Sequence, residues 1–184
     1  MPSPRRRTTS EMVYKNRNYP RLKEYNYSLL GYYYVTIHNE GNAPLLSRIE
    51  PAEGCCRANV KLTQNGMIAK EQLLLLEQRY SYVRIDKYVI MPNHIHAIIR
   101  MQDGQLPRPG LPDIVGAYKS LVTREINMLR NTPGRKQFQR SFYDTVIRSE
   151  AAYQSCWNYI DGNPDKWGFP EEIERNFRVI DGKL

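Results

Sequence analysis

The fold is best predicted from residues 88–99, which read YVIMPNHIHAII. Two apolar, β-branched runs flank Pro92-Asn93, a pair typical of turns, so the stretch predicts a β-hairpin whose second strand opens with His94-Ile95-His96. Side chains two residues apart leave a strand on the same face. We therefore expect both imidazoles on one face and Ile95 in a core on the other.

The histidine pair is a candidate metal site. Histidine is among the commonest metal ligands, and two adjacent neutral imidazoles favour a divalent ion. The same short pattern also fits two surface histidines without a ligand. Its position at the start of a strand, between two apolar runs, favours the metal site. The third histidine, His38, follows another predicted strand, and we interpret it as structural.

Composition bounds the class of protein. With 184 residues, 41% of them hydrophobic, the chain can form one compact domain. Lys and Arg number 27 against 19 Asp and Glu, a net charge of +8 that favours an anionic polymer such as nucleic acid as partner. The three cysteines show no CxxC spacing, so we expect no disulfide framework. Without a long apolar stretch or the apolar core of a signal peptide, we expect no membrane partner and a cytoplasmic protein, nucleoid-associated when bound to DNA.

The chain divides into an arm and a domain. Residues 1–28 are polar and basic, with Arg5, Arg6 and Arg7 near the start and tyrosines that include Tyr25 and Tyr27. They predict an N-terminal arm that contacts a nucleic-acid backbone and stacks on bases, or else a solvated terminus. Residues 29–184 are expected to form a single domain.

Hydrophobic periodicity predicts the elements of this domain. In chain order they are a strand at 32–37, a short hairpin strand at 57–62 within a loop-like region, a helix at 67–80, a strand at 82–91, the histidine strand, a helix with Asp113 as N-cap that ends at 131–134, a strand at 142–147, and a helix from Ser149 to Gly162. This order predicts an α+β, ferredoxin-like fold. It has an antiparallel sheet, helices on one face, and an appended C-terminal helix.

The C-terminal helix carries a candidate second half of the site. Tyr159 and Asn163 are four residues apart, so they share a helix face if the helix reaches Asn163, although Gly162 loosens the last turn. A tyrosine on a helix is ordinarily half-buried packing, and this chain has 14 tyrosines. The residue pattern alone leaves both interpretations of Tyr159 open.

Four blocks, in this order, carry a family resemblance: MPNHIH at 91–96, GAYKS at 116–120, FYDTVIR at 142–148 and YIDGNP at 159–164. Together they resemble the single-tyrosine HUH transposases, most closely the REP-associated tyrosine transposases, over about residues 25–168. The resemblance implies that His94, His96 and Asn163 hold a divalent metal, Mg²⁺ or Mn²⁺, and that Tyr159 is the nucleophile. Residue 145 is Thr where relatives often have His.

The resemblance also implies the function. We expect a metal-dependent endonuclease and strand transferase that cleaves single-stranded DNA through a 5′-phosphotyrosine during DNA transposition or recombination, at hairpin or REP-like sequences. A replication-initiator-like nickase and a non-catalytic DNA-binding descendant are the alternatives. A monomer is favoured over a dimer. Basic residues should contact the DNA backbone, namely Arg5, Arg6, Arg7, Lys119, Arg124, Arg135, Lys136 and Arg140.

Overall fold

The computed structural model describes residues 25–50, 58–104 and 106–167. Four antiparallel strands form the main sheet in the order β4-β5-β1-β6. Their bounds are β1 Gly31–His38, β4 Val83–Ile90, β5 His94–Met101 and β6 Tyr143–Ile147. The histidine strand β5 therefore lies inside the sheet, between β4 and β1, as the ferredoxin-like prediction requires.

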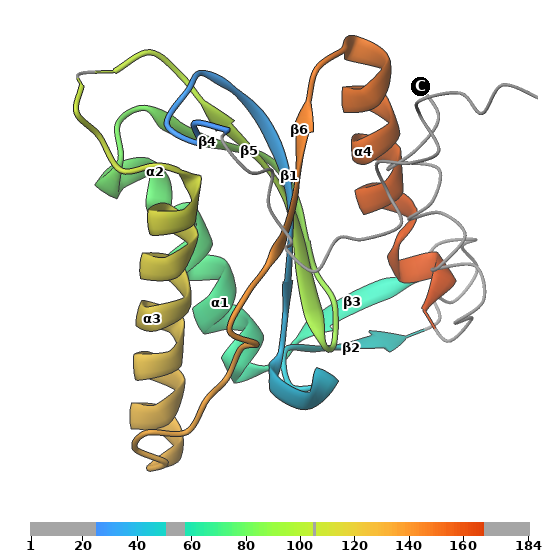
Figure 1. The fold of residues 1–184 in the computed structure, drawn as a ribbon. Coiled ribbons are helices and arrows are strands. Elements are labelled where there is room, and N and C mark those ends of the chain that lie inside the picture. Colours follow the sequence, from blue (N-terminus) through green and yellow to red (C-terminus); the bar gives the residue numbers. More distant parts are fainter. Residues whose placement is uncertain (1–24, 51–57, 105, 168–184) are drawn as a thin grey trace, which may run out of the picture.

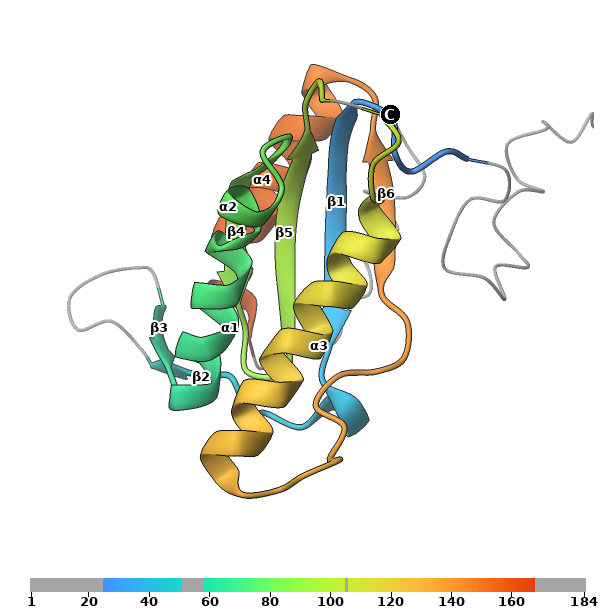
Figure 2. The same cartoon turned by 90° about the vertical axis from the view of Figure 1, so that its left-hand side faces the viewer.

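Helices cover both faces of this sheet. On one face lie α1 (Gln64–Leu74), α2 (Leu76–Arg79) and the long α3 (Leu111–Arg130) (Figure 1; Figure 2). On the opposite face lies α4 (Glu150–Gly162) (Figure 1). The appended C-terminal helix that the sequence predicts is therefore α4, which covers the second face of the sheet.

Alternation along the strands divides the apolar side chains into two cores. The larger core, under α1 and α3, includes Val35, Ile37, Ile95, Ile99, Ile114, Tyr118 and Val122. The smaller core, under α4, is formed by Tyr34, Ile98, Ile147, Cys156, Tyr159 and Ile160. Because Ile95 belongs to the larger core, its neighbours His94 and His96 face α4.

Two helix starts differ from the sequence prediction. α1 begins three residues early because the Thr63 hydroxyl accepts a hydrogen bond from the Gly66 N–H at 3.2 Å, and α1 ends before Leu75, where α2 follows. The N-cap of α3 is Gly110 rather than Asp113. The Asp113 carboxylate instead accepts from the Gly110 N–H at 3.1 Å, so it stabilises the helix start from inside the first turn.

A separate two-stranded hairpin joins β2 (Ser47–Glu50) to β3 (Asn59–Leu62). β3 overlaps the predicted strand at 57–62, whereas β2 was not predicted. Two short 3₁₀ helices, η1 (Glu40–Asn42) and η2 (Pro164–Lys166), follow β1 and α4. Of the cysteines, Cys156 is buried and free, while Cys55 and Cys56 lie outside the described residues.

The described residues of the predicted arm belong to the domain. The Tyr27 ring is buried, and its centroid lies 6.0 Å from that of Tyr33. The Tyr25 ring packs beside it, with its centroid 6.4 Å from that of Tyr33. The carbonyl of Tyr27 also accepts from the Leu111 N–H at 3.0 Å. Base stacking by these two tyrosines is therefore corrected to core packing. Arg5, Arg6 and Arg7 lie outside the described residues.

Among the helices that the structure describes, none combines the length and the apolar character needed to cross a membrane.

Candidate active site

His94 and His96 lie together on the α4 face of β5. Their ring centroids are 4.5 Å apart, and both side chains are buried. The prediction that the two imidazoles share one face of a central antiparallel strand is confirmed.

Oxygen atoms orient both imidazoles. Nδ1 of His94 lies 2.6 Å from the amide Oδ1 of Asn93, which can only accept, so Nδ1 carries the proton and Nε2 carries the lone pair. Nδ1 of His96 lies 2.7 Å from the Tyr34 hydroxyl and 2.9 Å from the Thr36 hydroxyl, and either hydroxyl oxygen can accept from an Nδ1–H. An Nδ1 held by oxygen is the usual arrangement for a histidine that binds a metal through Nε2. The donor set therefore fits a divalent cation.

Helix α4 places Tyr159 and Asn163 beside the histidines. The Tyr159 ring is buried and its centroid lies 5.3 Å from that of His96, at an interplanar angle of 75°. Asn163 keeps helical dihedrals (φ −64°, ψ −39°), so Gly162 does not end the helical path before it. The Asn163 side chain acts on both groups, since it raises the pKa of His94 and lowers that of Tyr159.

Burial sets the protonation of these groups. It is the main cause that lowers the pKa of His94 to about 3, and the neighbouring His38 contributes a smaller lowering. The Asn163 side chain has the opposite, smaller effect. Burial also holds the pKa of His96 well below its usual range. Both imidazoles are thus neutral near pH 7, the form that binds metal. Burial raises the pKa of Tyr159, against the opposing hydrogen bond from Asn163, so its hydroxyl is protonated at that pH.

His38 joins this cluster, although we interpreted it as structural. It ends β1 directly opposite His94 in the β1–β5 register, with ring centroids 5.5 Å apart. All three histidines of the chain therefore lie at one end of the sheet, with His38 beside His94. Only the strand register reveals this, since nothing local to His38 links it to the hairpin.

Within residues 25–50, 58–104 and 106–167, no three His, Cys, Asp or Glu side chains lie close enough together to hold a metal ion. A third protein ligand at this site would have to be of another type. The amide oxygen of Asn163 is such a group.

Thr145, the residue where relatives often have His, lies close to this cluster. Thr145 of β6 pairs with Tyr34 of β1, the residue whose hydroxyl contacts His96.

The predicted DNA-binding residues fall into two groups. Arg124, Arg135, Lys136 and Arg140 are exposed. Lys119 instead donates to the backbone carbonyls of Gln139, Arg140 and Ser141, at 2.5, 2.9 and 3.4 Å. Its ammonium group holds this segment against α3, a task different from the expected phosphate contact.

The segment that carries three of the exposed cations, Arg135, Lys136 and Arg140, borders the histidine cluster. The Gln139 N–H donates to the His38 carbonyl at 2.9 Å, and the Glu40 N–H donates to the Gln137 carbonyl at 2.9 Å. Because His38 pairs with His94, the basic residues flanking this contact lie at the same end of the sheet as the site.

Comparison with known proteins gives a relative and a fold. No protein-family model matches the chain. A functionally uncharacterised protein of Haemophilus influenzae is 30% identical over 165 residues, which cover 80% of this chain and 87% of that protein. The solved structure of a REP-associated tyrosine transposase bound to a REP hairpin superposes with a TM-score of 0.59 at 17% identity, over 89% of this chain and 92% of that one. The chain therefore belongs to one family with the Haemophilus influenzae protein, and its fold is that of the single-tyrosine HUH transposases, shared with the REP-associated tyrosine transposase.

Proposed function

We propose that this protein is a metal-dependent single-stranded DNA endonuclease and strand transferase that acts in DNA transposition or recombination. Its substrates would be hairpin or REP-like sequences, the kind of DNA to which the solved relative is bound. The observation that carries the proposal is the meeting of four side chains from β5 and the end of α4, namely His94, His96, Tyr159 and Asn163.

Tyr159 would supply the nucleophile. Its phenolic oxygen attacks the scissile phosphorus and loses its proton, the bond from phosphorus to the 3′-oxygen breaks, and the departing 3′-oxygen takes up a proton. The product is a 5′-phosphotyrosine and a free 3′-hydroxyl. Because the phosphodiester energy is kept in the new bond, a 3′-hydroxyl can attack it in turn and rejoin strands without a nucleotide cofactor.

The histidines and Asn163 would hold Mg²⁺ or Mn²⁺, since two imidazoles and an amide oxygen form a mixed N/O donor set. A bound divalent cation would neutralise charge on the non-bridging phosphate oxygens and orient the scissile bond. Asn93, Tyr34 and Thr36 keep the imidazoles oriented for this task. Asn163 contacts both His94 and Tyr159, so it links the ligand set to the nucleophile.

Replacing Tyr159 by Phe tests the proposal, because only the nucleophilic oxygen is removed. With a single-stranded hairpin oligonucleotide and Mg²⁺ or Mn²⁺, the wild type should form a covalent protein–DNA adduct on a denaturing gel. Tyr159→Phe should form none, yet bind the hairpin with nearly unchanged affinity. Tyr143→Phe, which removes an exposed hydroxyl near His38, is the matched control and should keep the adduct.

Other outcomes of this experiment would each indicate a different function. An adduct that persists in Tyr159→Phe would place the nucleophile elsewhere. Binding by the wild type without an adduct in either metal would indicate a non-catalytic DNA-binding protein. An adduct that never transfers to a second strand would indicate a nickase.

A further inference from the structure

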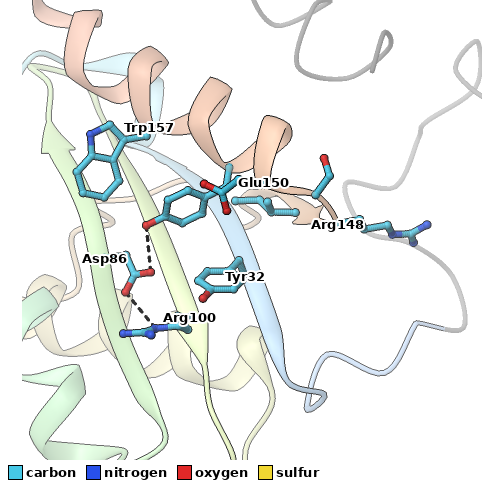
Figure 3. Close-up of a pocket in the computed structure, with 9 residues that line it drawn as sticks. Tyr32, Asp86, Arg100, Arg148, Glu150 and Trp157 are labelled. Atoms are coloured by element: carbon cyan, nitrogen blue, oxygen red, sulfur yellow. Dashed lines mark hydrogen bonds and ion pairs between the residues drawn. The ribbon is translucent and has the colours of Figure 1, made fainter.

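A pocket of about 660 Å³ lies further along the α4 face of the sheet, between the strands and the N-terminal half of α4 (Figure 3). This volume is typical of sites that bind small molecules or single groups of larger ligands. The mechanism above uses none of the side chains that line this pocket.

Aromatic rings form much of its wall. The Tyr32 and Tyr153 rings are 5.3 Å apart at 75°, and the Tyr153 and Trp157 rings are 5.9 Å apart at 38°. Aromatic faces are the usual surfaces on which unpaired bases stack.

A charged pair forms the polar part of the pocket. Oδ1 of Asp86 lies 3.2 Å from Nε of Arg100, and Oδ2 accepts a hydrogen bond from the Tyr153 hydroxyl at 3.3 Å (Figure 3). Burial and the Asp86 carboxylate raise the pKa of Tyr153, so its hydroxyl remains a donor. The Asp86 side chain is only 13% exposed, against 36% for Arg100. The pocket thus holds a carboxylate that is largely buried directly beside an arginine side chain that stays partly exposed.

A β-bulge builds this arrangement. Ile85 pairs with Ile99 and Lys87 with Ile98, so Asp86 is an extra residue in β4. Regular alternation would send Asp86 and Lys87 to opposite faces, but the bulge turns both toward α4. There Lys87 pairs with Asp161 at 2.7 Å and lies 4.7 Å from the centre of the Trp157 ring. Bulges commonly re-aim side chains at functional sites.

We propose that this pocket receives one unpaired base of the DNA substrate, and that it selects guanine or thymine. In both bases a carbonyl oxygen stands beside a ring N–H, which matches the guanidinium donors of Arg100 beside the Asp86 carboxylate. Adenine and cytosine present an amino group beside an acceptor nitrogen, the reverse order. Guanine offers one further acceptor, N7, to an arginine. The inference rests on the proposed function and names the specificity of that enzyme.

Its position suits a base near the cleavage point. Arg100 follows His96 by four residues on β5, which corresponds to about 13 Å of strand. Tyr34 and Ile98 of the smaller core lie on the same face between them. A base in the pocket would then be a few nucleotides from the scissile phosphate. Asp86, Arg100 and Trp157 would determine where cleavage occurs without touching the reacting atoms.

Fluorescence of the full chain without metal tests the pocket apart from cleavage. The chain has two tryptophans, so Trp167→Phe leaves Trp157 as its sole tryptophan. Eight-nucleotide strands of thymidine and of deoxycytidine are matched probes, since they differ mainly in the order of donor and acceptor. We expect thymidine strands to quench Trp157 and to bind about 5- to 150-fold more tightly, the range for one specific polar base contact.

Asp86→Asn, introduced beside Trp167→Phe, should remove this preference, because an amide also presents a donor at the position of the carboxylate. Glu150→Gln is the matched control. Glu150 also lines the pocket but lies at the start of α4, away from the Asp86–Arg100 pair, so the preference should survive (Figure 3). Circular dichroism checks that the variants are folded.

Equal affinity for the two strands, or a preference that persists in Asp86→Asn, would overturn the proposal. Those results leave the adduct test of Tyr159 unaffected. Conversely, loss of the proposed nuclease function would appear as an absent adduct with the fluorescence preference intact.

Discussion

At the residue scale, the chemistry of the histidine cluster depends on the polar atoms around each ring. Burial keeps the imidazoles neutral, and contacts with Asn93, Tyr34 and Thr36 determine which ring nitrogen faces the site. Such outer contacts usually account for a large part of metal affinity.

Tyr34→Phe should therefore weaken metal binding, because it removes one of the two hydroxyls that contact Nδ1 of His96. We expect Mn²⁺ affinity, measured by isothermal titration calorimetry, to fall about 10- to 100-fold. Tyr32→Phe removes a hydroxyl from the same face of β1, two residues earlier, and should leave Mn²⁺ affinity unchanged. Equal affinities for both variants and the wild type would show that the Tyr34 hydroxyl does not support a metal ligand.

Tyr118 gives a prediction on alkaline stability. Its hydroxyl is fully buried and donates to the Ala69 carbonyl at 3.0 Å, and burial raises its pKa. In the unfolded chain the phenol ionises near pH 10, while in the folded protein it stays neutral. Its contribution to stability is thus complete below pH 10 and declines as pH rises above that value.

Tyr118→Phe should lower the free energy of unfolding by about 1 kcal/mol at pH 8, because the hydrogen bond to Ala69 is removed. Between pH 8 and pH 11, the variant should lose less stability than the wild type. Urea unfolding at the two pH values measures both effects. A parallel decline of the two proteins would mean that Tyr118 ionises as readily in the folded state as in the unfolded state.

At the scale of elements, two helix glycines respond differently to the same substitution. In the first turn of α1, a Cβ on Gly66 would lie within van der Waals overlap of the Leu46 carbonyl oxygen, whose position is tied to α1 by a hydrogen bond from the Thr63 N–H at 2.9 Å. In α3, a Cβ on Gly116 would have no heavy atom within 4 Å.

Gly66→Ala should therefore destabilise the protein by about 1–3 kcal/mol, because backbone must move to admit the methyl group. Gly116→Ala should stabilise it by about 0.5–1 kcal/mol, since alanine is the better helix former. Urea unfolding of both variants and the wild type measures the two changes in stability. Effects of the same sign would contradict the close contact between α1 and the segment before β2.

At the scale of the whole molecule, the net charge of +8 and the histidine cluster should make separable contributions to the proposed activity on DNA. The exposed cations flank a segment hydrogen-bonded to the end of β1, next to the cluster. Loss of either could abolish activity, so the two must be distinguished by how binding depends on salt.

Replacing His94 and His96 by Ala should eliminate cleavage but leave the affinity for single-stranded DNA and its salt dependence almost unchanged, because neutral imidazoles release few counterions. Replacing Arg135, Lys136 and Arg140 by Ala should weaken binding and flatten the salt slope by up to about 0.7 for each phosphate group that the variant no longer neutralises. Fluorescence anisotropy over a range of NaCl concentrations measures both.

The control for charge removes three exposed cations away from this segment, Arg48, Lys70 and Arg79. A similar flattening in the control would mean that net charge matters rather than the position of the basic residues. Cleavage that survives both histidine substitutions in Mg²⁺ would show that the pair is structural.

Local sequence patterns determined the order of the elements and most of their bounds. Aromatic and β-branched residues predicted β1, alternation predicted β4, and an apolar run after the Pro92-Asn93 turn predicted β5. The spacing in His94-Ile95-His96 placed both imidazoles on one face. The Ser149 cap and the four-residue spacing of Tyr159 and Asn163 likewise predicted the helix that reaches the histidines. These features depend on residues close together in the chain, which share a periodicity or a cap.

Contacts between distant segments follow from the folded structure alone. His38 joins the cluster through the β1–β5 register, and Lys119 holds a segment twenty residues away from it in the chain. Tyr27 packs against Tyr33 in the larger core. The bulge at Asp86 shifts one strand against its neighbour and so creates the polar part of the pocket. Register, bulges and the choice of hydrogen-bond partner depend on pairing between segments far apart in sequence, and local composition carries no record of that pairing.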